Sequence, residues 1–127
     1  MILSLGAILG FISVAFGAYA EHGLRKHLTG EVFRTLMTAL RYHQVHAIMI
    51  VILGIVLLQS NKLSVIPAFR WSAYAFLVGT ALFSFSIYFS VMLRIPTLTR
   101  LAPWGGSTLM LGWLLLAWAG FIAIRKV

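Results

Sequence analysis

The sequence contains no cysteine and no aspartate, and its only carboxylate side chains are Glu21 and Glu31. The missing cysteines exclude disulfides, thiolate nucleophiles and cysteine-ligated metal sites. Chemistry that needs paired carboxylates would have to use both glutamates, and nothing in the sequence brings them together. Since the chain also lacks a glycine-rich nucleotide loop, we expect that it is not an enzyme and that it has no cofactor.

Charged residues of any kind are scarce, because they make up 9% of the 127 residues while 61% are apolar. A soluble domain typically has about 25% charged residues. This chain cannot cover a soluble surface with so few ionised groups. The composition therefore predicts an integral membrane protein, and the length predicts a single domain over residues 1–127.

The few charges are mostly positive and give a formal net charge of +8. In a soluble protein this excess would favour nucleic-acid binding, but no basic patch on a soluble surface is available here. In a membrane protein, Lys and Arg flank the spans and contact anionic lipid head groups. We therefore expect membrane lipids, anionic ones above all, as partners and no nucleic acid. A homo-oligomer or a larger membrane complex stays open.

Apolar stretches and prolines predict an all-α bundle of four transmembrane helices. The spans are expected at about residues 1–20, 42–60, 71–93 and 103–124, with Pro103 in the first turn of the last one. A signal peptide is the alternative for the first stretch, because AYA precedes Glu21. No Lys or Arg precedes that apolar run, so we expect it to be a retained span.

The segment between the first two spans is the polar part of the chain. Gly23 is expected to end the first helix, and Thr29 to cap a new helix with Glu31 in its first turn. Apolar residues then recur at helical spacing through Leu40. The pattern predicts an interfacial amphipathic helix over about residues 29–41, on the membrane surface or in a groove between spans. This helix can run straight into the second span.

Basic residues also bear on orientation, since cytoplasmic loops carry an excess of Lys and Arg. The loops after spans one and three contain six basic residues: Arg25, Lys26, Arg34, Arg41, Arg94 and Arg100. The opposite side holds four: Lys62, Arg70, Arg125 and Lys126. The difference favours the first and third loops inside and the termini outside.

The second span has a short apolar run, because Ala47 to Leu58 is only 12 residues. That run covers roughly 18 Å of helix, whereas the hydrocarbon core is about 30 Å thick. Polar side chains before it must therefore enter the membrane. His46 begins this span and His22 ends the previous one, and antiparallel neighbours place these ends at one level. We predict a polar junction of His22, Tyr42 and His46, in which a ring nitrogen binds a backbone carbonyl freed at the end of span one.

Two functional alternatives to this structural junction stay open. A proton or ion relay is one, because histidine titrates near neutral pH and ionisable groups inside membranes often mark pathways. A metal or haem site is the other, since His43 and His46 are three residues apart on one helix face and His22 could add a ligand. Few carboxylates and no thiol support such a site, so the signal is weak.

Small residues indicate close helix packing in the first and last spans. The candidate packing residues are Gly6, Gly10, Gly17, Gly105, Gly106 and Gly112. Glycine at such positions lets two helix backbones approach closely, either within one chain or between two copies. We favour packing within the chain. In span three, Ser84, Ser86 and Ser90 are expected to bond to backbone or to pack closely rather than to line a pore.

Several short motifs resemble one known family. GAYAEHGL at 17–24, RYHQVHAIMI at 41–50, LFSFSIY at 82–88 and APWGGSTLMLGWLLLA at 102–117 are similar, in order, to the signatures of the YgdD / transmembrane protein 256 family. That family of small four-span membrane proteins is a domain of unknown function. The chain departs from it at Ala20, Glu21, His43 and Phe85, which shifts weight toward His22 and His46.

The resemblance implies a multi-pass protein of the bacterial inner membrane, or of the mitochondrial inner membrane in a eukaryote, and it implies no established activity. Our leading hypothesis is a non-enzymatic accessory, assembly or lipid-organising component. The alternative is a small oligomeric proton-coupled transporter or channel that uses His46 and His22. A haem- or metal-binding membrane subunit is the third hypothesis.

Overall fold

The computed structural model describes residues 1–126, and for residue 126 the backbone alone. Within that range all regular structure is helical, which confirms the all-α fold class. Four helical stretches are long and apolar enough to cross a membrane: Ile2–His27, Gly30–Gln59, Pro67–Leu93 and Pro96–Arg125. Each covers one of the four expected spans to within one residue and extends beyond it at one end or both.

The helices follow one another with short connections. The first crossing is α1 (Ile2–Tyr19), a π-helical turn η1 (Ala20–Leu24) and a 3-10 turn η2 (Arg25–His27), and the second is α2 (Gly30–Gln59). A short α3 (Asn61–Ser64) leads to the third crossing, made of α4 (Pro67–Thr80), a π-helical segment η3 (Ala81–Phe85) and α5 (Ser86–Leu93). A 3-10 segment η4 (Pro96–Leu101) precedes α6 (Ala102–Lys126).

Capping residues explain where several helices begin. The Thr29 hydroxyl accepts a hydrogen bond from the Val32 amide, which confirms it as the cap of α2. Pro67 opens α4 and Pro103 lies in the first turn of α6, where a missing amide hydrogen costs little. The prediction that Gly23 ends the first helix is wrong. The chain stays helical through η1, and among the described residues no glycine has a positive φ.

The amphipathic segment at 29–41 is not a separate element but the beginning of α2. This helix has 30 residues, or about 45 Å, which exceeds the roughly 30 Å of a hydrocarbon core. The second crossing is therefore not short. Only its uninterrupted apolar run is short, and the polar residues before that run continue the same helix.

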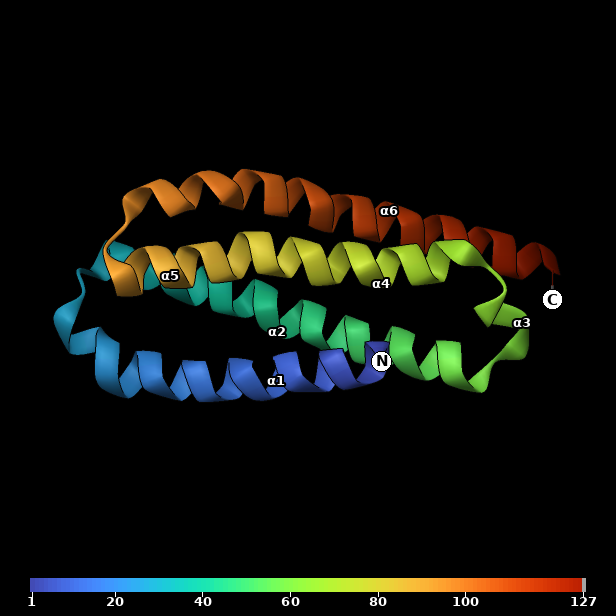
Figure 1. Cartoon of the computed structure of the whole chain (residues 1–127), viewed down its shortest axis with the longest axis horizontal. Helices are drawn as coiled ribbons and strands as arrows, with labels where there is room; N and C mark the ends of the chain where they lie inside the picture. The colour runs from blue at the N-terminus through green and yellow to red at the C-terminus, as the bar shows by residue number, and fades with distance from the viewer. Residues whose placement is uncertain (127) are drawn as a thin grey trace.

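Neighbouring crossings run antiparallel and lie side by side in the order α1, α2, α4 with α5, and α6 (Figure 1). The contacts join α1 to α2, α2 to α4 and α4 to α6. Consequently α1 and α6 lie on the two outer sides of the bundle. Two buried clusters form the core, one around Ile50, Phe76 and Leu109 and the other around Leu36 and Tyr88.

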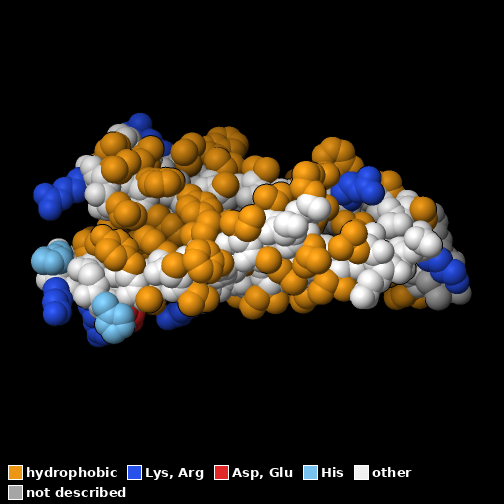
Figure 2. Space-filling model, turned by 60° about the horizontal axis from the view of Figure 1, so that its bottom comes forward, with side chains coloured by type: hydrophobic (Ala, Val, Ile, Leu, Met, Phe, Trp, Pro, Cys, Tyr) orange, Lys and Arg blue, Asp and Glu red, His pale blue; other side chains and the backbone are white. Residues whose placement is uncertain are grey.

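The surface has the polarity that a membrane-spanning bundle requires. Hydrophobic side chains cover the middle of the visible face, and Lys and Arg gather toward the two ends (Figure 2). Exposed large apolar residues occur on every crossing, for example Phe11, Ile48, Val78 and Leu114. In lipid these side chains need no further cover, because acyl chains are as apolar as they are.

Candidate functional site

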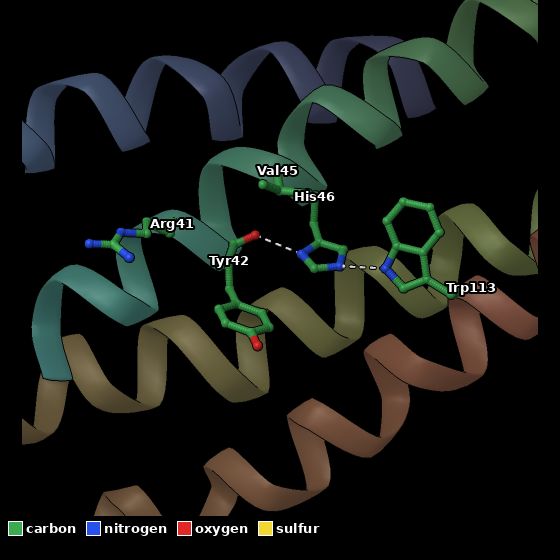
Figure 3. Close-up of a pocket in the computed structure, with 5 residues that line it drawn as sticks. All are labelled: Arg41, Tyr42, Val45, His46 and Trp113. Atoms are coloured by element: carbon green, nitrogen blue, oxygen red, sulfur yellow. Dashed lines mark hydrogen bonds between the residues drawn. The ribbon is translucent and has the colours of Figure 1, made fainter.

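His46 of α2 makes the polar contact between α2 and α6. Its side chain is 3% exposed. His46 Nδ1 lies 2.6 Å from the Tyr42 carbonyl oxygen, and Trp113 Nε1–H donates to His46 Nε2 at 3.1 Å (Figure 3). A carbonyl can only accept and an indole N–H can only donate. His46 is therefore a neutral imidazole with its hydrogen on Nδ1 and with both nitrogens in use.

Aromatic rings surround this imidazole. The ring centroids of Phe76 and Trp113 lie 5.2 Å and 6.0 Å from that of His46. Beside the imidazole is a cavity of about 290 Å³ lined by Arg41, Tyr42, Val45, His46 and Trp113. The cavity thus lies between α2 and α6 and has the histidine at its wall.

The register of α1 on α2 places His46 near the middle of the crossing. Gly6 packs against Ile50 and Val51, and Gly17 packs against Leu40. On α2, His46 lies between Leu40 and Ile50. It is therefore at the same depth as a residue between Gly6 and Gly17, near the middle of α1. An imidazole at this depth needs hydrogen-bond partners, because an unsatisfied polar group is costly in hydrocarbon.

The prediction that His22 and His46 meet is wrong. His22 is exposed in η1, beyond the end of α1. The visible histidine atoms gather at the end of the molecule in Figure 2. Gly17 of α1 is level with Leu40 of α2, and the two helices run antiparallel. His22, five residues beyond Gly17, is therefore level with a part of α2 that lies about 11 residues, or roughly 17 Å, before His46. The sequence hypothesis began the second crossing at residue 42, whereas α2 begins at Gly30.

Tyr42 belongs to the site through its backbone carbonyl and through its ring. The carbonyl that binds His46 lies one turn earlier in the same helix and is not one freed at the end of α1. The Tyr42 ring is 45% exposed and packs on Phe83 with centroids 4.8 Å apart. The ring therefore forms part of the cavity wall.

His43 is a second buried imidazole, although the resemblance to the family shifts weight away from it. Its side chain is fully buried, and Nδ1 shares a hydrogen bond of 3.1 Å with the Tyr88 hydroxyl of α5. Nε2 is buried and has no hydrogen-bond partner among the described residues. His43 and His46 thus turn to different partners. Among the described residues no three His, Cys, Asp or Glu side chains converge as a metal-binding group.

Two buried serines also join crossings, in each case neighbouring ones. The Ser84 hydroxyl donates to the Ala39 carbonyl at 2.7 Å, and the Ser72 hydroxyl donates to the Gly112 carbonyl at 2.8 Å. Ser86, in contrast, bonds to the Phe83 carbonyl of its own crossing. No local sequence signal distinguishes Ser84 from Ser86, because the partner of Ser84 is 45 residues away.

We expect Ser84→Ala to lower the free energy of unfolding by about 1 kcal/mol, because hydrogen bonds between membrane helices contribute about 0.6 to 2 kcal/mol. Ser86→Ala is the matched control and should change it by much less, since its bond lies within one helix. Unfolding by SDS titration in mixed micelles measures both values. Equal losses for the two variants would show that the Ser84 bond does not join the crossings.

The structure separates the candidate packing glycines into three groups. A Cβ added at Gly6 would lie 2.8 Å from the Val51 nitrogen, one at Gly112 would lie 2.6 Å from Phe76, and one at Gly105 would collide with the Phe83 backbone. A Cβ at Gly17 would be tight against Leu40, and one at Gly106 would make an ordinary contact. Gly10 faces open space and does not pack within the chain.

Two further glycines make close contacts that the sequence hypothesis missed. A Cβ at Gly54 would lie 2.6 Å from the Leu3 backbone, and one at Gly79 would lie 2.6 Å from the Leu109 side chain. Neither lies four residues from another glycine, which is the spacing that draws attention to Gly6. Glycine within a helix costs about 1 kcal/mol relative to alanine. An isolated glycine in an apolar helix is therefore itself a sign that another helix packs closely there.

Comparison with known proteins supports the resemblance seen in the sequence. A family model described as "Protein of unknown function (DUF423)" matches residues 16–106. A "UPF0382 membrane protein" of Haemophilus influenzae is 33% identical over 94% of this chain and 92% of its own length. The "UPF0382 inner membrane protein YgdD" of Escherichia coli K12 is 32% identical over 98% of this chain and 91% of its own length. No solved structure matches.

Proposed function

The chain belongs to the DUF423 family of membrane proteins, and from that premise we propose that it is a non-enzymatic component that organises lipid or stabilises a membrane assembly. It is a multi-pass inner-membrane protein, as expected from its four apolar crossings and from its relatives. The family description supplies no activity, so the proposal rests on the geometry of the bundle.

The observation that carries the proposal is the state of His46. A proton relay needs an imidazole with a nitrogen that can exchange its proton with a pathway. In this bundle Nδ1 is bound to Tyr42 and Nε2 is bound to Trp113, so neither nitrogen is left for such an exchange. The arrangement supports a structural histidine that fastens α6 to α2.

Other buried polar groups support the same role. His43, Ser72 and Ser84 each bond to a crossing other than their own. The two carboxylates lie elsewhere, because Glu21 and Glu31 are exposed near the loop between α1 and α2. Several of the polar groups inside the bundle therefore join helices.

A native purification in mild detergent tests the proposal. The protein, its co-purifying proteins and its lipids are identified by mass spectrometry. We expect a reproducible set of lipids or partner proteins at near-stoichiometric amounts. Recovery of a bare chain from several detergents, with neither lipid nor partner retained, would contradict the proposal.

A small transporter or channel is the second candidate, and one observation favours it. His46 lies near the middle of the crossing and at the wall of a cavity, which is where carriers place an ionisable group. The predicted pair of His46 and His22 cannot serve together, however, because His22 lies at the end of the bundle.

Flux measurements in proteoliposomes separate the two candidates. Under our proposal the protein carries no proton or cation flux above that of empty liposomes, and His46→Ala and His22→Ala change nothing. A protein-dependent flux that His46→Ala abolishes would replace the structural proposal with the transport one.

A third candidate, the haem- or metal-binding subunit, predicts bound metal or a Soret band in protein that is expressed with both metal and haem supplied.

A further inference from the structure

We propose that the cavity between α2 and α6 holds one acyl chain of an anionic phospholipid, whose phosphate is bound by Arg41. This inference deepens the lipid-organising branch of the proposed function and rests on it. It assigns a place on the protein, a class of lipid and the residue that recognises its head group.

Arg41 carries an uncompensated positive charge at the rim of the cavity. It is exposed, and among the described side chains of residues 1–125 the one ion pair joins Arg25 to Glu21. In Figure 3 the Arg41 side chain extends away from His46, toward the Gly30 end of α2. Guanidinium binds phosphate strongly and can do so with two parallel hydrogen bonds, which makes a lipid phosphate a suitable counter-charge.

The depth of Arg41 fits a lipid head group. Arg41 lies five residues before His46 on a continuous helix, hence about 7.5 Å nearer the loop end of the bundle. Its long side chain can reach the head-group level while its stem stays beside acyl chains. A lipid whose phosphate is bound at that level extends its acyl chains toward the middle of the membrane. One of these chains would then enter the cavity.

The walls of the cavity suit hydrocarbon. Tyr42, Val45 and Trp113 present large apolar surfaces, and each is between 42% and 50% exposed toward the membrane. The polar atoms at the inner end are already used, because His46 and Trp113 bond to each other. A polar ligand would find no free partner at that end, whereas an acyl chain needs none.

The charge favours an anionic lipid over a zwitterionic one. A choline head group places a cation beside the phosphate that Arg41 would bind, whereas a glycerol head group does not. Each basic residue near a membrane surface contributes about 1 kcal/mol to the attraction of anionic lipid. We therefore expect phosphatidylglycerol to be retained about five-fold more strongly than phosphatidylcholine.

Native mass spectrometry of the detergent-solubilised protein, titrated with either lipid, tests this proposal. Arg41→Gln should weaken phosphatidylglycerol binding about five-fold and remove the preference over phosphatidylcholine. Arg34→Gln is the matched control, because Arg34 is exposed on the same helix two turns earlier and does not line the cavity. It should leave both lipids bound as in the unchanged protein.

A cavity-filling variant supplies the second arm. Val45 is 50% exposed, so Val45→Trp fills the cavity without entering the core, and it should reduce retention of both lipids. Equal losses in Arg41→Gln and Arg34→Gln would overturn the proposal in favour of general surface charge. Retained binding in Val45→Trp would also overturn it, because the chain would then lie elsewhere. Either result leaves the proposed function standing if lipids or partners still co-purify.

Discussion

Replacing Gly105 with alanine is expected to lower the free energy of unfolding by about 2–3 kcal/mol. Gly105 is buried at the start of α6, where an added Cβ would collide with the backbone of Phe83 in η3. Backbone atoms cannot rotate away as a side chain can. The methyl group would therefore push α6 off the third crossing along its first turns.

Gly106→Ala is the matched control, at the neighbouring position of the same helix. A Cβ there would lie 3.9 Å from the Phe83 ring, which is an ordinary contact. Because alanine is a better helix former than glycine, this variant should be unchanged or more stable by up to about 1 kcal/mol. Unfolding by SDS titration gives both values. Similar values for the two variants would mean that α6 does not approach the third crossing as closely as described.

The Gly105 contact matters for the candidate site because it helps to set the position of α6. Trp113 lies two turns further along the same helix and reaches His46 from there. Gly112, beside Trp113, lets Phe76 pack closely, and its carbonyl accepts the Ser72 hydroxyl. The close helix approach and the hydrogen bonds therefore act together in placing the indole against the imidazole.

Replacing His46 with alanine is the other variant with a large expected effect, a loss of about 3 kcal/mol. It removes a buried ring from among Phe76, Tyr42 and Trp113, and large-to-small changes at buried positions cost about 2–5 kcal/mol. It also leaves the Trp113 N–H without its acceptor.

His22→Ala is the control for that variant, since His22 is exposed at the end of the bundle and should tolerate the change within about 0.5 kcal/mol. Thermal unfolding in a mild detergent, followed by circular dichroism, measures both proteins. A His46→Ala protein as stable as the unchanged one would show that the imidazole does not fasten the helices.

Much of the fold could be predicted because the membrane sets the lengths. The four apolar stretches and the flanking charges predict the number of crossings. The Thr29 cap and the prolines follow from local backbone chemistry. The boundaries were less predictable, because polar residues such as Glu31 and Arg34 continue a helix whose apolar run begins only at Ala47.

The candidate site was predictable only in part. The short apolar run showed that polar residues enter the membrane, and His46 is indeed buried there. The partner was not predictable, because Trp113 is 67 residues away and neither periodicity nor spacing relates the two. Helix faces are also hard to assign in lipid, where the outside is as apolar as the interior. His43 receives little weight from the sequence because the chain departs there from the family it resembles, and its partner Tyr88 lies on another crossing.

A double-mutant cycle on His46 and Trp113 tests the central claim most directly. The unfolding free energies of His46→Phe, Trp113→Phe and the double variant are compared with that of the unchanged protein. If the indole N–H donates to the imidazole and holds α6 on α2, the two changes should be coupled by about 1 kcal/mol. Additive losses, with a coupling indistinguishable from zero, would contradict the account.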